Sequence, residues 1–258
     1  MRIFMIIDTH CHIYDSEIEN ADEIIREAAK KNIYLILNGT DPLSNREVLE
    51  LSAKYENVYA ALGYFYSFAD KITDEDISLL DLQLKNDKVV AVGEIGLDYY
   101  HTKENSDAQK LLFEKMINLA EKHDLPVIVH SRKSMQDTFD ILKKHNVRGS
   151  LHSYQGSAEM AAEFIKLGFY IGVGGSITHT NNKKVIKTVK KVAINHMLVE
   201  TDSPYLTPQE KMGEKNTPLN LKYITQKIAD VVDMNEDDVI EITTDNAKKL
   251  FKMGLSTN

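Results

Sequence analysis

The N-terminal segment Ile3-Phe-Met-Ile-Ile-Asp8-Thr-His-Cys-His12 distinguishes between two kinds of α/β fold. Its apolar half predicts a strand over Ile3–Asp8, because the run is short, ends in a carboxylate and lacks the cleavage site of a signal peptide. In a doubly wound sheet that binds a nucleotide, a glycine-rich turn would follow this first strand. Here Asp8-Thr-His-Cys-His12 stands in that place, which favours the alternative fold, a closed barrel.

Outward from this stretch, short apolar runs alternate with segments of helical periodicity along the whole chain. The apolar runs are nearly continuous, as expected for a parallel sheet that is covered on both faces. The predicted strands are Ile3–Asp8, Ile33–Asn38, Val58–Leu62, Val89–Gly93, Val127–His130, Gly149–His152, Tyr170–Val173 and Met197–Glu200. The predicted helices include Ala108–Lys122, Ser134–Lys144, Ala158–Leu167, Lys183–Lys191, Leu219–Val232 and Glu236–Met253.

Eight strands that alternate with helices predict one α/β domain over residues 1–258. We expect a (β/α)8 TIM barrel with its active site at the C-terminal ends of the strands, since such barrels use this length as one domain. The sequence contains no linker, internal repeat or low-complexity tract. The longest irregular stretch, Tyr205–Pro218, is a candidate lid.

The composition restricts the class of protein. Hydrophobic residues make up 43% and charged residues 27%, which is typical of a globular protein with a large core. No apolar run is long enough to cross a bilayer, and the single cysteine excludes an internal disulfide, so we expect a cytoplasmic protein with no membrane contact. The net charge of −8 argues against a broad basic surface for nucleic acid. Attraction of such a substrate would depend on bound metal and a few local Lys and Arg residues.

Candidate metal ligands follow several of the predicted strands. His10 and His12 are two residues apart, so in an extended segment both imidazoles point the same way while Cys11 faces the core. Neutral imidazole suits zinc, iron, nickel and copper, and a site with carboxylates also holds manganese or magnesium. Each further candidate stands at a strand end: Glu94, His130, His152 and Asp202.

The shared position of these residues separates them from ordinary strand-end polar residues. Taken singly, Glu94 would be read as a helix cap and His130 as a residue bonded to backbone. The C-terminal strand ends of a barrel converge on one mouth, so six side chains of metal-ligand type there predict a shell for two divalent cations. The other histidines lack this placement. His123 and His145 lie near helix C-termini, His196 precedes the eighth strand, and His101 and His179 are loop residues, better read as solvated than as substrate contacts.

With these blocks in place, the chain resembles the TatD-type metal-dependent deoxyribonucleases, a branch of the TIM-barrel metal-dependent hydrolases. The resemblance covers essentially the whole chain. It rests on the blocks Asp8-Thr-His-Cys-His12, Gly93-Glu-Ile-Gly-Leu-Asp-Tyr-Tyr100, Val129-His-Ser-Arg132, the block around His152, Glu200-Thr-Asp-Ser-Pro-Tyr-Leu206, Asn216-Thr-Pro218 and Thr244-Asp-Asn-Ala-Lys-Lys-Leu-Phe251.

The resemblance implies a role for each matched residue. His10 and His12 would bind one metal, and His130 and His152 the second. Glu94 would bridge the ions, and Asp202 would bind the first metal and accept a proton from the attacking water, so Glu94 and Asp202 are the expected catalytic residues. The expected cofactors are two divalent ions, with magnesium, manganese and zinc left open. The expected substrate is DNA, single-stranded or at strand ends, with no obligate protein partner.

Two departures from the family concern substrate binding. The family has a His-Pro-His segment after the third strand, where this chain has Gly63-Tyr-Phe-Tyr-Ser67. We expect Tyr64, Phe65 and Tyr66 to offer a stacking face for a base, although packing of the loop onto the barrel explains aromatic residues equally well. The second departure is Lys133, which replaces an acidic residue. It stands beside Arg132, our candidate for a phosphate contact, for which a surface ion pair is the competing interpretation.

Two other functions remain open. The first is a metal-dependent hydrolase of an amide, ester, lactone or aminoacyl ester on the same barrel, because fold does not fix function. Some barrel hydrolases of that kind bridge their metals with a lysine, and Glu94 in this position favours the nuclease branch. The second is a barrel that binds metal or a partner without catalysis. All six ligand candidates are present, which argues against a decayed site.

Overall fold

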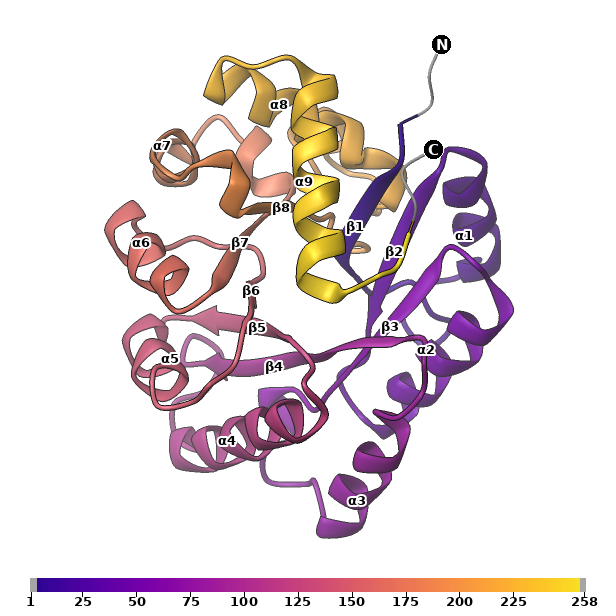
Figure 1. The fold of residues 1–258 in the computed structure, drawn as a ribbon, viewed down its shortest axis with the longest axis vertical. Coiled ribbons are helices and arrows are strands. Elements are labelled where there is room, and N and C mark those ends of the chain that lie inside the picture. Colours follow the sequence, from indigo (N-terminus) through magenta and orange to yellow (C-terminus); the bar gives the residue numbers. More distant parts are fainter. Residues whose placement is uncertain (1–3, 256–258) are drawn as a thin grey trace.

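The computed structural model describes residues 4–255, and within this range eight parallel strands form one sheet in the order β1 to β8. Helices alternate with the strands around the barrel (Figure 1). The predicted (β/α)8 TIM barrel is thereby confirmed. The strands are β1 (Ile6–Cys11), β2 (Ile33–Asn38), β3 (Val58–Leu62), β4 (Val89–Asp98), β5 (Val127–Arg132), β6 (Gly149–Leu151), β7 (Phe169–Val173) and β8 (Met197–Val199).

Most of the α-helices of the described range cover the outside of the barrel, while α9 lies across one end of it (Figure 1). They are α1 (Ala21–Lys30), α2 (Pro42–Lys54), α3 (Asp74–Gln83), α4 (Ser106–His123), α5 (Met135–Leu142), α6 (Ala158–Lys166), α7 (Lys183–Lys191), α8 (Leu221–Val232) and α9 (Glu236–Phe251). Short 3-10 segments include η1 (Tyr66–Phe68) and η2 (Gly175–Thr178). Each of the six predicted helices is present within two residues of its expected bounds.

Local sequence signals begin several helices. Asp41 precedes α2, and its side chain accepts hydrogen bonds from the backbone amides of Leu43 and Ser44, while Pro42 occupies the first helical position. Thr73 caps α3 in the same way, with Asp76 completing a capping box. These caps satisfy backbone donors that have no partner inside the helix. They set where these two helices start.

Two strand bounds differ from the sequence prediction in a way that bears on the site. β1 begins at Ile6 and extends to Cys11, whereas Ile3, the predicted start, lies outside the described residues. β4 continues past Gly93 to Asp98, because Ile95 to Asp98 remain paired with Val129 to Arg132 of β5. The two glycines of β4 read as a strand end in the sequence, since glycine weakens strands.

One end of the barrel is closed by α9, which lies in front of the strands in Figure 1. A cluster of buried apolar side chains from six strands packs against the end of this helix at Leu250, Phe251 and Met253. The strand members of this cluster are Ile7, Ile36, Ala61, Val90, Ala91, Ile128 and Leu198. Most of them lie near the starts of their strands, so the opposite, C-terminal end of the barrel is left for the polar side chains.

Candidate metal centre

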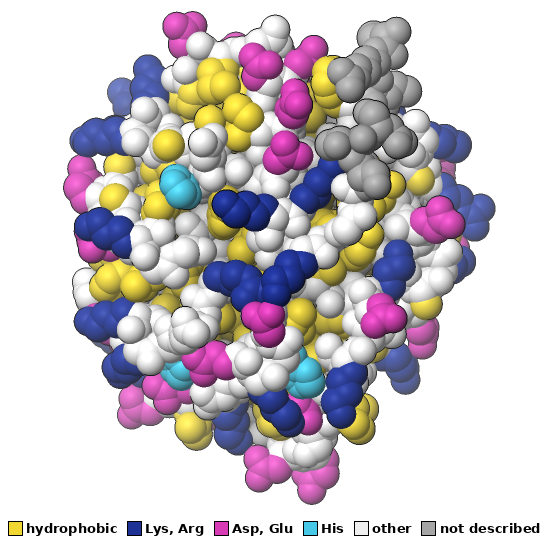
Figure 2. Space-filling view, viewed as in Figure 1, with side chains coloured by type: hydrophobic (Ala, Val, Ile, Leu, Met, Phe, Trp, Pro, Cys, Tyr) yellow, Lys and Arg dark blue, Asp and Glu magenta, His cyan; other side chains and the backbone are white. Residues whose placement is uncertain are grey.

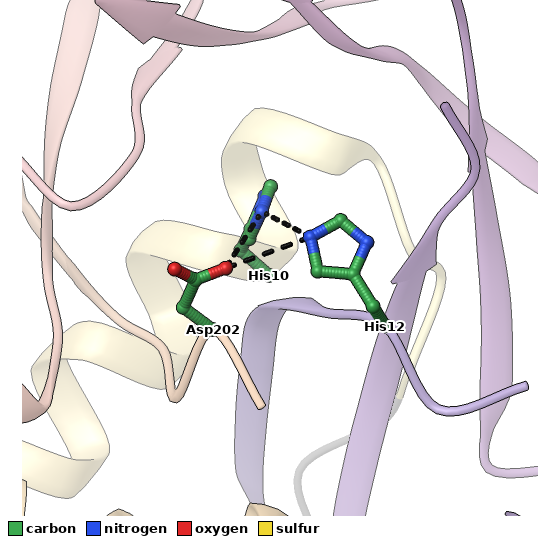
Figure 3. A group of neighbouring side chains, drawn as sticks. All are labelled: His10, His12 and Asp202. Carbon is green, nitrogen blue, oxygen red and sulfur yellow. Dashed lines mark hydrogen bonds and ion pairs between the residues drawn. The ribbon is translucent and has the colours of Figure 1, made fainter. Parts of the chain in front are cut away.

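The ends of β1 and β8 are tied together by backbone hydrogen bonds that set the positions of three predicted ligands. The amide of Asp202 donates to the carbonyl of His10 at 2.8 Å, and the amide of His12 donates to the carbonyl of Ser203 at 2.7 Å. Buried Asp8 accepts from the amide of Thr201 at 2.9 Å. The side chains of His10, His12 and Asp202 consequently point toward one another (Figure 3).

The orientation of the His12 imidazole is fixed by a hydrogen bond on its far side. Its Nδ1 lies 2.8 Å from the carbonyl oxygen of Asn38 at the end of β2, so Nδ1 carries the proton. In the neutral ring, Nε2 would then present its lone pair to the centre of the mouth. This arrangement, with one ring nitrogen held by a carbonyl and the other free, is typical of a metal-binding histidine.

Four donor atoms lie around one point at the mouth. His10 Nε2 and His12 Nε2 are 3.1 Å apart. Glu94 Oε2 lies 3.5 Å from the first nitrogen and 3.4 Å from the second, and Asp202 Oδ1 lies 3.4 and 3.5 Å from them. Ligands at zinc-like bond lengths in a tetrahedron are about 3.3–3.6 Å apart, so these donors fit one divalent cation.

A second set of donors uses the other oxygen of Glu94. Its Oε1 lies 2.9 Å from His152 Nε2 and 3.2 Å from His130 Nδ1. The two imidazole nitrogens are 3.1 Å apart. The Glu94 carboxylate thus faces one histidine pair with each oxygen, which fits a position between two cations. The structure brings all six predicted ligands together.

The electrostatics of the mouth favour positive charge. Burial disfavours the charged form of His10, but Glu94 and Asp202 outweigh it and raise its pKa to about 9. Burial also opposes charge on His130, yet Asp98 and Glu94 raise its pKa to about 9. Burial would raise the pKa of Glu94, whereas His152 and His10 hold it well below its usual range. The carboxylates thus give the mouth a negative charge that a bound cation would neutralise.

Asp98 is a buried residue of the site that the sequence analysis did not single out. Its Oδ2 lies 3.0 Å from His130 Nε2 and 2.9 Å from His101 Nδ1, while its Oδ1 accepts the backbone amides of Tyr100 and His101. It therefore leaves His130 Nδ1 free to face Glu94. The signal was present, because Glu94 and Asp98 are four residues apart and share one face of a strand that continues past Gly93.

His101 was expected to be a solvated loop residue, and the structure gives it fixed partners instead. Asp98 holds its Nδ1, and the hydroxyl of Tyr66 lies 3.0 Å from the same nitrogen. The ring remains half exposed at the mouth, with 53% of its side-chain surface accessible. His101 is thus positioned by the same carboxylate that holds His130.

Glu200 is a second buried acid that the sequence analysis did not select. It stands two residues before Asp202, and its Oε1 lies 3.7 Å from His152 Nδ1 and accepts the amide of Ser153. Burial raises its pKa to about 8. Gly172 in β7 leaves room for the Glu200 side chain. A Cβ atom at this position would lie only 2.4 Å from Glu200 Oε2, so a larger residue would collide with the carboxyl group. A carboxyl group therefore backs the far side of His152.

Arg132 lies at the end of β5, exposed beside the metal ligands. Its guanidinium carbon is 3.9 Å from the centre of the Tyr100 ring, and the side chain makes no ion pair within 4.0 Å among residues 4–255. The ion-pair interpretation is therefore not what the structure shows. The guanidinium group of Arg132 instead stacks on the ring of Tyr100. Tyr100 itself is 59% exposed.

The expectation of a stacking face at Tyr64 and Tyr66 is corrected by the structure. Tyr64 is 1% exposed, and its hydroxyl donates to the carbonyl of Asp76 in α3, so the ring packs the loop onto the barrel. Tyr66 is 8% exposed, and its ring already stacks on His101 and His130. Neither ring has a free face for a base. Phe65, the third aromatic residue of this expectation, is partly exposed and lies 5.0 Å from the His130 ring.

The candidate lid at residues 205–218 is pinned to the barrel. Asn216 donates through its side-chain amide to the carbonyls of Thr201 and Tyr205, at 2.8 and 2.6 Å. The amide of Gln209 donates to Thr178 Oγ1 of η2 at 2.8 Å. The loop is therefore anchored at both ends, beside the start of the segment that leads into α7.

The remaining histidines lie outside the two donor sets. His123 contacts Asp81 at 2.7 Å, and His145 contacts Glu121 at 3.3 Å. His179 Nε2 lies 2.9 Å from the carbonyl of Thr207. Their contacts within the described residues are structural, which separates them from the six ligand candidates.

Comparison with known proteins places the whole barrel in one family. Residues 7–252 match the family described as "TatD related DNase". The chain is 37% identical over 256 residues to the protein named "Uncharacterized metal-dependent hydrolase YabD" from Bacillus subtilis, covering 96% of this chain and 100% of that protein.

Solved structures agree with this assignment. The crystal structure of YjjV, a TatD homologue from Escherichia coli K12, superposes with a TM-score of 0.91 at 30% identity, covering 98% of this chain and 100% of that chain. The phosphotriesterase homology protein of E. coli has a TM-score of 0.72 at 12% identity, covering 97% and 100%, and shows only that the fold is shared. Among the described residues, no helix has both the length and the apolar character needed to cross a membrane.

Proposed function

The chain belongs to the family of TatD-related DNases and is a metal-dependent hydrolase, and from this premise we propose that it cleaves phosphodiester bonds in DNA. The substrate in this proposal is a single strand or a strand end, because the reacting phosphate must reach a mouth whose ligand side chains are largely buried. The cofactors are two divalent cations, drawn from magnesium, manganese and zinc.

The observation that carries this proposal is the position of Glu94. Its Oε2 faces the His10–His12 pair, and its Oε1 faces the His130–His152 pair. A carboxylate placed in this way would let His10, His12 and Asp202 hold one cation and His130 and His152 hold a second. The donor set of four imidazoles suits zinc or manganese better than magnesium, which prefers oxygen ligands.

In such a centre, bound cations lower the pKa of a water molecule and neutralise charge on the phosphoryl oxygens. Asp202 is the residue we assign to take the proton of that water. Its Oδ1 is directed at the two imidazoles, and Figure 3 shows the second carboxylate oxygen turned away from them. Burial would raise the pKa of Asp202, but His10 and His12 lower it, so the group is ionised at neutral pH.

The rim supplies the groups we assign to substrate binding. Arg132 has a free guanidinium whose fork geometry matches phosphate oxygens. Tyr100, on which Arg132 stacks, offers an exposed aromatic ring for a base. Phe65 occupies the part of the rim where the family resemblance leads us to expect His-Pro-His, so we propose that contacts to the phosphate there differ from that pattern.

A substrate panel tests the bond that is cleaved. Protein reloaded with each of the three metals would be assayed on a chromogenic phosphodiester and on a carboxylic ester, with bound metal counted by mass spectrometry. We expect two metal ions per chain and turnover of the phosphodiester. Turnover confined to the carboxylic ester would replace the nuclease proposal with the ester hydrolase. Two bound metals without any turnover would support the non-catalytic alternative.

A further inference from the structure

Helix α7 is the most basic segment of an acidic chain. The stretch 164–199 contains six lysines and no aspartate, glutamate or arginine, although the whole chain has a net charge of −8. Five of these lysines fall in the nine residues of α7, Lys-Lys-Val-Ile-Lys-Thr-Val-Lys-Lys. Every other α-helix of the described range contains at least one acidic residue. α7 thus has five positive charges that no acidic residue of the same helix balances.

The lysines of α7 all lie on its outer face. Val185, Thr188 and Val189 are buried against the barrel, following the spacing of one helical face. The exposed side chains are Lys183, Lys184, Lys187, Lys190 and Lys191. In Figure 2, Lys and Arg side chains follow the left edge of the molecule, over the region where Figure 1 places α6 and α7.

Among the residues that the structure describes, most of the lysines of α7 have no carboxylate partner. Lys191 pairs with Glu159 of α6 at 3.1 Å. The other four have no carboxylate oxygen within 4.0 Å among residues 4–255, whereas lysines on α1, α2, α4 and α6 are paired. Like charges three or four residues apart destabilise a helix. The arrangement therefore costs stability in the free protein, and a bound polyanion would relieve this cost.

The position of α7 relates its charge to the metal centre. β7 ends at Val173 on the side of the mouth, and the chain then passes through η2 into α7, so Lys183 and Lys184 lie at the mouth end of the helix. The pinned loop 205–218, which carries Lys211 and Lys215, is hydrogen-bonded to Thr178 and His179 just before α7. The nine residues of α7 extend about 13 Å, which matches the axial rise of about four nucleotides in one strand of a B-form duplex.

We propose that the lysine face of α7 is a docking surface for the phosphate backbone of a polynucleotide whose end lies in the metal centre. This inference rests on the proposed function and names how the substrate is held outside the reacting site. Lysine is suited to the task, because an ammonium group on a flexible stem contacts phosphates without reading the base sequence. The lysine face would also attract the polynucleotide locally, whereas the net charge of −8 of the whole chain repels it.

The test compares two triple variants with the same loss of charge. One is Lys183→Gln/Lys184→Gln/Lys187→Gln on α7, where glutamine preserves helix propensity. The matched control is Lys31→Gln/Lys85→Gln/Lys144→Gln, three exposed lysines without a carboxylate partner that lie just after α1, α3 and α5, away from the mouth. Circular dichroism melts of both proteins establish that the fold is retained.

Binding would be measured on the metal-loaded proteins by fluorescence anisotropy. The probe is a labelled 20-nucleotide single strand with phosphorothioate linkages, which keep the backbone charge and resist cleavage. Each lysine–phosphate contact contributes about 0.7 to the slope of log affinity against log salt, so the α7 variant should lower that slope by about 2. The ratio of wild-type to variant affinity should then be about a hundred-fold larger at 0.1 M salt than at 1 M salt. The control variant should keep the wild-type slope.

Equal losses in the two variants would overturn the proposal, because they would show an effect of net charge alone. An unchanged slope in the α7 variant, or no binding by the wild-type protein, would overturn it as well. Hydrolysis of bis(p-nitrophenyl) phosphate by the same preparations separates this outcome from a failure of the proposed function. Wild-type protein that binds the strand but hydrolyses no phosphodiester would leave the docking surface standing and refute the nuclease.

Discussion

Replacing Asp98 with asparagine should weaken one of the two metal sites and leave the other intact. Oδ1 of Asp98 accepts two backbone amides, so asparagine would keep its oxygen there and place its NH2 group against His130 Nε2, where the carboxylate oxygen now lies at 3.0 Å. That group is a donor, so it favours the tautomer of His130 that carries its proton on Nδ1. Nδ1 is the nitrogen that faces Glu94.

The expected loss of metal affinity can be estimated, because Asp98 orients a metal-binding histidine without being a ligand itself. Loss of the hydrogen bond behind a metal-binding histidine costs about 10- to 100-fold in metal affinity, or about 1.4–2.7 kcal/mol. The loss should fall on the site of His130 and His152. The His10–His12–Asp202 site has no hydrogen bond to Asp98 among the described residues, so its affinity should stay within about two-fold of the wild type.

Competition against a chromogenic chelator measures the two affinities separately. The matched control is His101→Asn, which removes the other imidazole from Asp98 without touching His130. We expect two affinities of wild-type strength in the control and one weakened affinity in Asp98→Asn. Equal weakening of both sites, or no weakening, would refute the assignment of Asp98 as the partner that orients His130.

Three further outcomes follow from the geometry of the mouth. Cys11→Ser should leave metal binding and turnover nearly unchanged, because the thiol is fully buried away from the donors; a large loss of bound metal would show that its orientation is wrong. Gly172→Ala should destabilise the fold by about 1–3 kcal/mol in a urea titration, since the new Cβ would meet Glu200 Oε2 at 2.4 Å; an unchanged midpoint would contradict this packing. Metal binding should strengthen as pH rises toward 9, because His10 and His130, with pKa values of about 9, must lose their protons before they bind metal. Calorimetry of metal binding at pH 7.5, in buffers of different ionisation enthalpy, should detect the release of at least one proton. Binding without proton release would refute this prediction.

The barrel could be predicted from the sequence because every strand is a compact apolar run. β2 and β3 have the predicted bounds, and the two donor sets comprise the six residues chosen at strand ends. Strand ends converge in a barrel whatever the details of the loops, so the position of each candidate carried most of the information.

The residues behind the donors were harder to find because their roles depend on tertiary contacts. Asp98 was hidden by the glycines of β4, which conceal a strand that continues to pair with β5. Glu200 reads as one more acid in an acidic chain until Gly172 opens space for it beside His152. Tyr64 and Tyr66 could not be excluded as stacking residues for the same reason. The sequence does not reveal that other side chains already cover their rings.

Metal ions held at the mouth should act on DNA, and restoring metal to stripped protein examines this directly. Protein stripped of metal would be incubated with end-labelled single-stranded DNA while magnesium, manganese and zinc are restored separately, with Asp202→Ala as the control. We predict cleavage that returns with metal and is absent from the variant, and the product ladder would give its polarity. Stoichiometric metal binding without cleavage by any metal, or equal cleavage by Asp202→Ala, would contradict the account.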